Sequence, residues 1–365
     1  MYKKVIHALL GAALFVLSAV TSAAGTGEKA YIALEGDGKI AVLDTQTRQV
    51  IKQIDLTVSL DGMPIAFAPH NVQVAPNGKT VWVTANVQGE HEEHGQTGHE
   101  SMATGSEDQV IVIDPQSDSI TQRIPIAVNA HLSHVVVTND GETAYVNAQK
   151  QERIYRIDAA SYRVLGFTQV SGQGPHGIRL STDSLKAYAA MMHGKNLGIL
   201  DTVTGGIRYV FLGGAAVQTG VTPDGKMALT SLFDVKRVAL FQTAGGQLDF
   251  VNLPSAAKGP LQLYPTPDSL FVYVADQGDT TSQTPGEQVY KIGLANKQVT
   301  AAIKVGKAPH GVVVSKDRGK VYVTNLLSGD ISEIDTGSDK EIARIPVGKE
   351  PNGISLWSPQ AGGTP

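Results

Sequence analysis

The feature that most constrains the fold of this chain is a repeat that covers nearly its whole length. The clearest copy, at residues 308–348, reads APHGVVVSKDRGKVYVTNLLSGDISEIDTGSDKEIARIPVG. It contains four short runs rich in Val and Ile, separated by segments of Gly, Asp, Ser and Lys. Runs of this kind between such turns are typical of antiparallel strands. Each copy therefore predicts a four-stranded meander.

The two ends of the chain supply one further copy beside the six that are complete. Residues 30–56 contain the second, third and fourth strands of a unit but lack the first, and EPNGISLW at residues 350–357 is a first strand with nothing after it. Pairing of these ends closes a ring and leaves no exposed sheet edge. The spacing between equivalent positions, such as His134 and His176, fits propeller blades of roughly 40–50 residues. The sequence therefore predicts an all-β, seven-bladed β-propeller over residues 25–358.

The start of the chain has the pattern of a secretory signal peptide over residues 1–24. A short basic start precedes an apolar run at residues 5–20, and small residues then favour cleavage after Ala23 or Ala24. A membrane anchor is the alternative, although the run is short of the roughly 20 apolar residues that a spanning helix needs. We expect export to the periplasm or the cell exterior, a mature protein without a membrane span, and a flexible tail at residues 359–365.

The composition excludes several classes of protein. A formal net charge of −4 over 365 residues is too small to favour nucleic-acid binding. The chain has no cysteine, so it forms no disulfide and attaches no c-type haem through C-x-x-C-H. Its 39 glycines suit short strands and tight turns. We expect a monomer whose partner is a small ligand or another periplasmic protein.

Polar residues recur where the first strand of each blade begins. In an up-and-down blade the first strand lines the central channel, so these residues are expected to form a ring at one channel mouth. Around the ring they read Asn352, His70, His131 or His134, His176, Gln218, Gln262 and His310. In three blades the neighbouring residues Ser133, Val217 and Leu261 are alternatives for this position. The choice between His131 and His134 stays open.

An insertion in the second blade adds more histidines. GEHEEHGQTGHE at residues 89–100 places His91, His94 and His99 among four glutamates. It connects the second strand to the third, and such loops emerge on the same face as the starts of the first strands. His193, in MMHGKN, lies in the equivalent loop of the fourth blade. The insertion and the polar ring are therefore expected on one face.

Neutral imidazole is the commonest protein ligand for Zn, Cu and Ni, and three or four make a site. The sequence therefore predicts a transition-metal site, for Cu or Zn, on this face. Two versions are open: a labile site within the insertion, and an ordered site at the channel mouth. The structural alternative is that the histidines only hydrogen-bond neighbouring blades and that the insertion is merely solvated. The candidate ligands are His70, His91, His94, His99, His134, His176, His193 and His310.

The repeat resembles that of the YVTN family of β-propeller proteins. The motif stands at residues 322–325, with degenerate versions at 81–85, 144–148 and 272–276. The wider set that the chain resembles includes haem-d1 propellers, the copper-binding propeller of nitrous oxide reductases, sugar lactonases and quinoprotein-associated proteins. The resemblance implies the fold, but not a single function, because propellers with such repeats do many things.

No residues can be assigned to catalysis. The chain lacks a G-x-S-x-G elbow, an H-E-x-x-H helix and a glycine-rich nucleotide loop. The leading hypothesis is an exported, non-enzymatic binding protein that holds a transition metal or metal cofactor at the channel mouth. One alternative is a metal-free scaffold that docks proteins through the loops at 57–67, 88–107 and 277–287. Another is an enzyme with a channel-bound cofactor, either haem-d1-related or lactonase-like.

Overall fold

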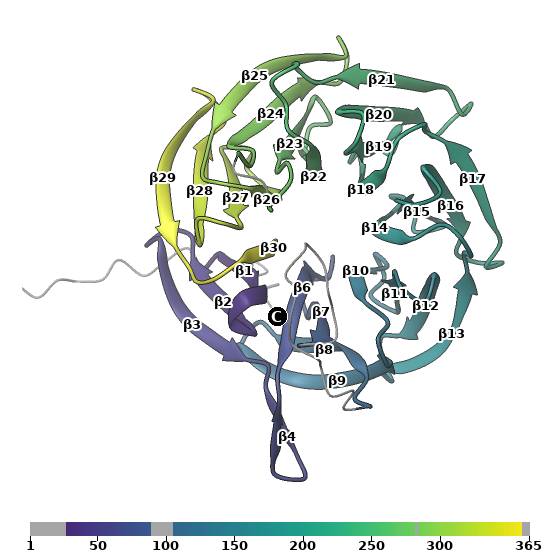
Figure 1. The fold of residues 1–365 in the computed structure, drawn as a ribbon, viewed down its shortest axis with the longest axis vertical. Coiled ribbons are helices and arrows are strands. Elements are labelled where there is room, and N and C mark those ends of the chain that lie inside the picture. The colour runs from purple at the N-terminus through teal and green to yellow at the C-terminus, as the bar shows by residue number, and fades with distance from the viewer. Residues whose placement is uncertain (1–26, 89–104, 282–283, 360–365) are drawn as a thin grey trace, which may run out of the picture.

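The computed structural model describes residues 27–88, 105–281 and 284–359, which form seven four-stranded antiparallel sheets arranged in a ring (Figure 1). The predicted all-β, seven-bladed propeller is confirmed. In these ranges the one helical element is the 3-10 turn η1 (Glu35–Asp37). The proposed signal peptide at residues 1–24 lies outside the described residues, as do 360–365 of the proposed tail.

The blades are numbered along the chain, and each is given from its innermost strand outward. Blade 1 comprises β30 (Pro351–Trp357), β1 (Lys29–Leu34), β2 (Lys39–Asp44) and β3 (Gln49–Asp55). Blade 2 comprises β6 (Phe67–Val74), β7 (Val81–Val87), β8 (Asp108–Asp114) and β9 (Ser119–Ala127). Blade 3 comprises β10 (Leu132–Val137), β11 (Thr143–Ala148), β12 (Arg153–Asp158) and β13 (Arg163–Gln169). Blade 4 comprises β14 (Pro175–Leu180), β15 (Lys186–Met191), β16 (Asn196–Asp201) and β17 (Ile207–Phe211).

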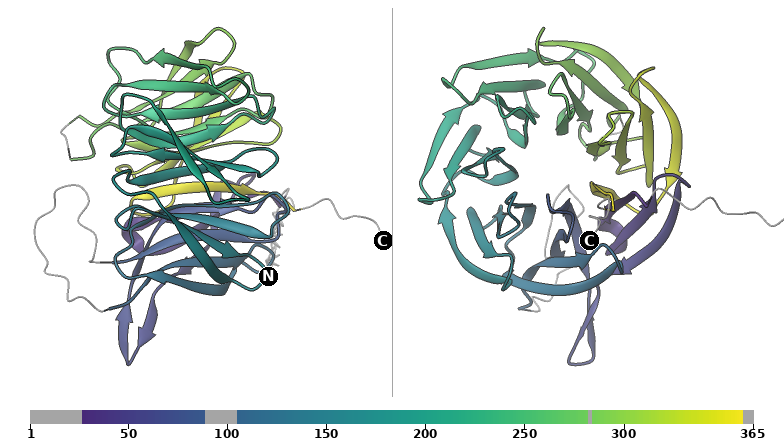
Figure 2. Two further views of the ribbon diagram at one scale, coloured as in Figure 1. Left: turned by 90° about the vertical axis from the view of Figure 1, so that its right-hand side faces the viewer. Right: turned by 180° about the vertical axis from the view of Figure 1, so that it is seen from behind.

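The remaining blades follow the same order. Blade 5 comprises β18 (Ala216–Val221), β19 (Met227–Leu232), β20 (Arg237–Gln242) and β21 (Leu248–Asn252). Blade 6 comprises β22 (Pro260–Pro265), β23 (Phe271–Asp276), β24 (Gln288–Gly293) and β25 (Gln298–Lys304). Blade 7 comprises β26 (Pro309–Val314), β27 (Lys320–Asn325), β28 (Asp330–Asp335) and β29 (Lys340–Pro346). Between blades 1 and 2 the hairpin of β4 (Val58–Leu60) and β5 (Met63–Ile65) projects from the ring (Figure 2).

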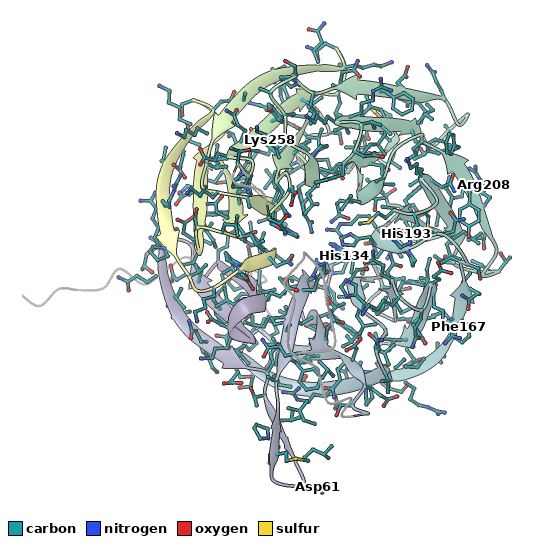
Figure 3. All side chains as sticks on the ribbon, in the orientation of Figure 1. Asp61, His134, Phe167, His193, Arg208 and Lys258 are labelled. Carbon is teal, nitrogen blue, oxygen red and sulfur yellow. The ribbon has the colours of Figure 1, made fainter. Side chains whose placement is uncertain are left out.

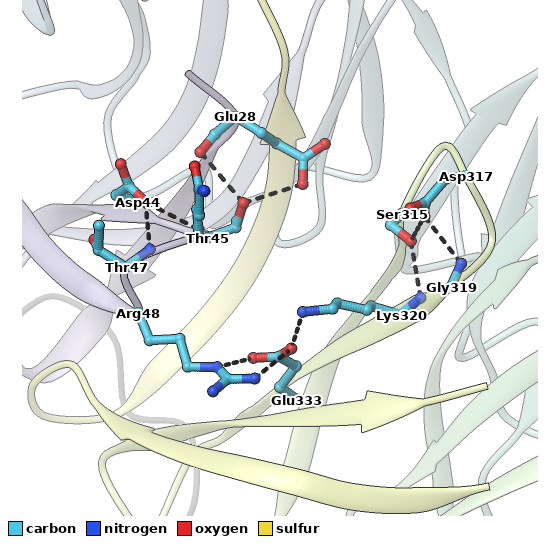
Figure 4. A network of polar contacts seen from close by, with 11 residues as sticks. Glu28, Asp44, Thr45, Thr47, Arg48, Ser315, Asp317, Gly319, Lys320 and Glu333 are labelled. Carbon is cyan, nitrogen blue, oxygen red and sulfur yellow. Dashed lines mark hydrogen bonds and ion pairs between the residues drawn. The ribbon is translucent and has the colours of Figure 1, made fainter. Parts of the chain in front are cut away.

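The predicted closure by the two chain ends is confirmed. Strand β30 pairs antiparallel with β1, with Tyr31 opposite Ser355, and it contacts the first strands of blades 2 and 7. An ion-pair network spans the seam between blade 7 and blade 1 (Figure 4). Glu333 of blade 7 is fully buried and accepts hydrogen bonds from Arg48 of blade 1, at 2.6 Å from Nε, and from Lys320. Ring closure therefore depends on the sheet of blade 1, which joins the two chain ends, and on a buried carboxylate at the seam between blades 7 and 1.

The aromatic residues of the second strands pack between blades. Trp82 and Tyr188 are almost completely buried. Trp82 lies in one apolar cluster with residues of both blade 2 and blade 3, and Tyr188 joins residues of blades 4 and 5. Burial of such large side chains is the main favourable contribution to holding neighbouring blades together. The seven interfaces leave the innermost strands around a central channel (Figure 2).

No helix in the described part of the chain has the length and apolar character that crossing a membrane requires.

Candidate metal centre

A β-bulge in each innermost strand sets the level of the site. In blade 4, Pro175 pairs with Met191 and Ile178 with Ala189, so that His176 and Gly177 together oppose a single residue. A bulge of this kind bends the strand and re-aims its side chains. The register shift recurs in all seven first strands. The bulge pairs are Asn352–Gly353, His70–Asn71, Ser133–His134, His176–Gly177, Val217–Gln218, Leu261–Gln262 and His310–Gly311.

This register accounts for the loose alignment seen in the sequence. The polar ring predicted from the sequence draws on both bulge positions. In blades 3, 5 and 6 its residue occupies the second position (His134, Gln218 and Gln262), and in the other blades it occupies the first. In blades 1, 4 and 7 the second bulge position is glycine, within a P-x-G motif. Backbone atoms of the next blade lie too close to this position for a side chain. A Cβ on Gly311 would lie 2.5 Å from the carbonyl oxygen of Asn352, and one on Gly177 would lie 2.8 Å from that of Val217. Either position would therefore reject a side chain.

Three histidines from three consecutive blades converge at this level. One ring nitrogen each of His70, His134 and His176 lies within 4.8 Å of the other two, and all three residues are buried. The ring centroids of His134 and His176 are 5.2 Å apart. Figure 3 shows His134 beside the centre of the ring. The bulges thus bring together residues that are far apart along the chain.

Two further histidines border this group. The ring centroids of His131 and His310 lie 6.0 Å and 6.2 Å from that of His70. His131 precedes β10 and has a left-handed backbone with φ of 51°. Its backbone N–H donates to the buried carboxylate of Asp108 at 2.9 Å. Both residues between which the sequence could not decide, His131 and His134, therefore face the same cluster.

Hydrogen bonds orient two of the rings. Nδ1 of His176 lies 2.9 Å from the carbonyl oxygen of Val217 and donates to it, which leaves Nε2 with the lone pair. Nε2 of His134 lies 3.4 Å from the side-chain amide of Gln262. Nδ1 of His134 is buried and has no hydrogen-bond partner among the described residues. A buried imidazole nitrogen without a partner is costly unless something binds it.

A carboxylate supports the cluster from η1. Oε1 of Glu35 lies 3.6 Å from Nδ1 of His70, and the amide of Asn352 donates to Oε2 at 2.6 Å. Burial acts to raise the pKa of Glu35, but the hydrogen bond and charge of His70, together with Asn352, outweigh it and lower the pKa to about 2. Glu35 is therefore ionised at neutral pH. Carboxylates that contact the second nitrogen of a histidine commonly orient that histidine toward a metal.

The same surroundings keep His134 neutral. Burial lowers the pKa of His134 well below its ordinary value, and the charges of His176 and Arg179 lower it further. A neutral ring keeps the lone pair that a metal requires. Three imidazole nitrogens are the donor type that Zn and Cu prefer. Tetrahedral bonds of 2.0–2.1 Å place ligand nitrogens about 3.3 Å apart, which is closer than the 4.8 Å within which these three nitrogens lie. The rings would have to rotate inward to enclose an ion.

The other predicted ligands fall elsewhere. His193 is exposed in the turn between β15 and β16, where its backbone N–H donates to the carbonyl oxygen of Gln173, and it is not part of the convergent group. His91, His94 and His99 lie outside the described residues.

Two residues at the site have no counterpart in the sequence predictions. Glu35 lies in the turn after β1, outside the repeated motif, and no local pattern singles it out. Gln277, whose side-chain oxygen contacts Nδ1 of His310, follows the second strand of blade 6. It belongs to a loop that the sequence does place on this face, and that is the one signal that could have found it.

Comparison with known proteins places the chain by fold alone. No protein-family model and no curated protein matches it. Among solved structures it is similar to virginiamycin B lyase from Staphylococcus aureus, at 14% identity and a TM-score of 0.62, over 80% of this chain and 91% of that one. It is similar to Kuenenia stuttgartiensis hydrazine synthase at 17% identity and a TM-score of 0.64, over 89% and 100%. It is also similar to dihydro-heme d1 dehydrogenase NirN in complex with DHE, at 13% identity and a TM-score of 0.61, over 93% and 77%.

Proposed function

We propose that this propeller binds a single transition-metal ion, Zn or Cu, through His70, His134 and His176. The observation that carries the proposal is the convergence of three buried ring nitrogens within 4.8 Å, delivered by equivalent bulges of three neighbouring blades. Histidines that served only to join blades would bond to the adjacent backbone, as Nδ1 of His176 does, and would not need to meet at one point.

A bare ion fits this arrangement better than a haem. A haem iron takes its protein ligands along a single axis, so one histidine on a face is sufficient. Three donors that converge on one point form part of a tetrahedral set instead. The similarity to a NirN structure with a bound ligand supports the haem alternative only through the shared fold. An absorbance band of a bound macrocycle would favour that alternative over ours.

The role we propose is binding without catalysis. A site enclosed by buried side chains, with His131 and His310 near enough to supply a fourth ligand, resembles a closed structural centre more than an open catalytic one. The pattern of residues 1–24 supports export as part of this proposal, and the motif at residues 322–325 supports kinship with YVTN repeat proteins. The metal-free docking scaffold remains the competing function, and the enzyme with a channel-bound cofactor has no assigned residues.

Elemental analysis of the mature protein, purified without a polyhistidine tag, tests the proposal. We expect about one equivalent of metal in the wild type and in a variant that lacks residues 89–100. We expect the metal to be lost in His176→Ala and retained in His193→Ala, the matched exposed histidine. Metal that disappears with residues 89–100 but survives His176→Ala would move the site to the insertion. Metal in none of the proteins would favour the docking scaffold.

A further inference from the structure

The opposite end of the channel contains a second tier of equivalent residues. Each lies beyond the bulge and pairs with the second-strand residue at the aromatic position, for example Arg179 with Tyr188 and Tyr264 with Tyr273. All of them line a cavity of about 730 Å³, a volume within the usual range for small-molecule sites. The tier consists of Ser355, Gln73, Val136, Arg179, Gly220, Tyr264 and Val313.

Arg179 is the one charged residue of this tier. The other six blades place uncharged residues at the equivalent position, so the repeat itself does not require a cation there. Its single hydrogen bond among the described residues runs from Nη1 to the carbonyl oxygen of Ile178 at 2.8 Å, and no described carboxylate pairs with it. Burial lowers the pKa of its guanidinium. A partly desolvated cation without a counter-ion costs folding free energy unless a bound anion pairs with it.

Tyr264 supplies a hydroxyl near the same place. Tyr264 and Arg179 line the same cavity. Burial raises the pKa of Tyr264, and the charge of Arg179 partly offsets this, so the hydroxyl keeps its proton at neutral pH. Gly220 occupies the intervening blade and has no side chain to stand between them. A Cβ there would lie 2.6 Å from Cδ1 of Leu263, so that a larger residue would have to displace that side chain. Blades 4 and 6 thus present a guanidinium and a phenol to one space.

The remaining wall is largely apolar, with Leu180, Val221, Val314 and Trp357 among its residues. Two more charged residues line the cavity. Lys316 is exposed at the rim, and the carboxylate of Glu28 accepts a hydrogen bond from Thr45 at 3.2 Å. A single inner cation among apolar walls suits a monoanion with an apolar body better than a strongly hydrated dianion such as phosphate.

We propose that this cavity binds a small organic carboxylate, whose two oxygens accept hydrogen bonds from the guanidinium of Arg179 and the hydroxyl of Tyr264, and whose apolar part lies against Trp357 and the valines. The site is separate from the histidine cluster. His176 and Arg179 are three residues apart on one strand, or about 10 Å. The proposal does not depend on a metal being bound.

Equilibrium binding of decanoate, followed by the fluorescence of Trp357, tests the proposal. The other tryptophan, Trp82, is fully buried between blades and serves as an internal reference. We expect saturable binding of decanoate, at least about tenfold weaker binding of the neutral analogue decanol, and no competition by inorganic phosphate. Because a hydrogen bond to a charged group contributes about 1.5–3 kcal/mol, Arg179→Gln should weaken decanoate binding by about 10- to 100-fold. Tyr264→Phe should weaken it less.

The controls separate this site from the metal site and from misfolding. Lys316→Gln removes an exposed cation from the same rim and should leave affinity nearly unchanged. Arg179→Lys keeps the charge but loses the planar fork, and should fall between wild type and Arg179→Gln. Metal content should be the same in all these variants. Equal affinity for decanoate and decanol, full affinity in Arg179→Gln, or displacement by phosphate would each overturn the proposal. If Arg179→Gln fails to fold, wild-type affinity in Arg179→Lys and Tyr264→Phe would overturn it.

Discussion

The two tiers of the channel are built from the same seven strands and carry opposite chemistry. At the bulges, imidazoles are buried, one is held neutral, and they are supported by Glu35, a set of groups suited to a cation. Beyond the bulges, Arg179 lies in a largely apolar cavity and pairs with no described carboxylate, a setting suited to an anion. The backbone is equivalent from blade to blade at both levels. The two proposed sites therefore differ because different blades depart from the repeat at each tier.

Replacement of a metal-ligating histidine should give the largest difference between the two tiers. We expect His176→Ala to weaken metal binding by more than about 100-fold, since changes in outer-shell partners alone cost about 10- to 100-fold. Decanoate affinity should change by no more than about fourfold, the limit expected from charge coupling between the two tiers. Metal affinity is measured by competition with a chelator of known strength. A loss of both metal binding and decanoate binding would mean that the substitution disturbs blade 4 as a whole, which circular dichroism would reveal.

Removal of the supporting carboxylate is a milder change at the same tier. Glu35→Gln keeps the shape but loses the charge beside His70, and we expect metal affinity to fall by about 10- to 100-fold. Asp37→Asn, in the same turn, is the matched control. Equal metal affinity in both variants would show that Glu35 does not orient the cluster.

The closing seam provides a change outside both tiers. Glu333→Gln removes a buried carboxylate that binds Arg48 and Lys320, and should lower the free energy of unfolding by about 1–3 kcal/mol. Metal and decanoate should still bind at temperatures where the variant is folded. Chemical denaturation measures the loss. A large fall in metal or decanoate affinity with unchanged stability would show that the seam is not independent of the channel.

The same variant should change the acid sensitivity of the fold. Burial acts to raise the pKa of Glu333, but Arg48 and Lys320 outweigh it and hold the pKa below its usual range. A depressed pKa stabilises the fold above the unfolded value of about 4.3, and this contribution is lost as pH falls through the folded value. The difference in stability between wild type and Glu333→Gln should therefore shrink as pH falls below about 4.3. A constant difference would show that the network contributes through packing alone.

The smallest expected effect is coupling between the tiers. The charge of Arg179 reaches His134, whose pKa it helps to lower. An anion that neutralises Arg179 should therefore raise metal affinity, by about two- to fourfold if water screens the channel over about 10 Å. Metal titrations with and without saturating decanoate measure the change, and Arg179→Gln should abolish it. By reciprocity the metal should raise decanoate affinity by the same factor. A decrease instead would show that the ligands compete.

The repeat alone was sufficient to predict the number of blades, their strand order and the ring closure at residues 350–357, because strand periodicity and turn chemistry are local signals. The same reasoning placed His70, His176 and His310 at one channel mouth. The motif at residues 322–325 resembles the YVTN repeat, and no family model matches the chain.

Only the tertiary structure decided which polar residues meet. The bulge register brings His134 into the group with His70 and His176, while His193, on the loop predicted for the same face, lies exposed outside it. Glu35 contacts His70 and also Asn352, which comes from the opposite end of the chain. In the sequence Arg179 is one charged residue in a predicted strand, and only the arrangement of the seven innermost strands places it in a cavity. Such contacts depend on ring closure and strand register, which no local stretch of sequence encodes.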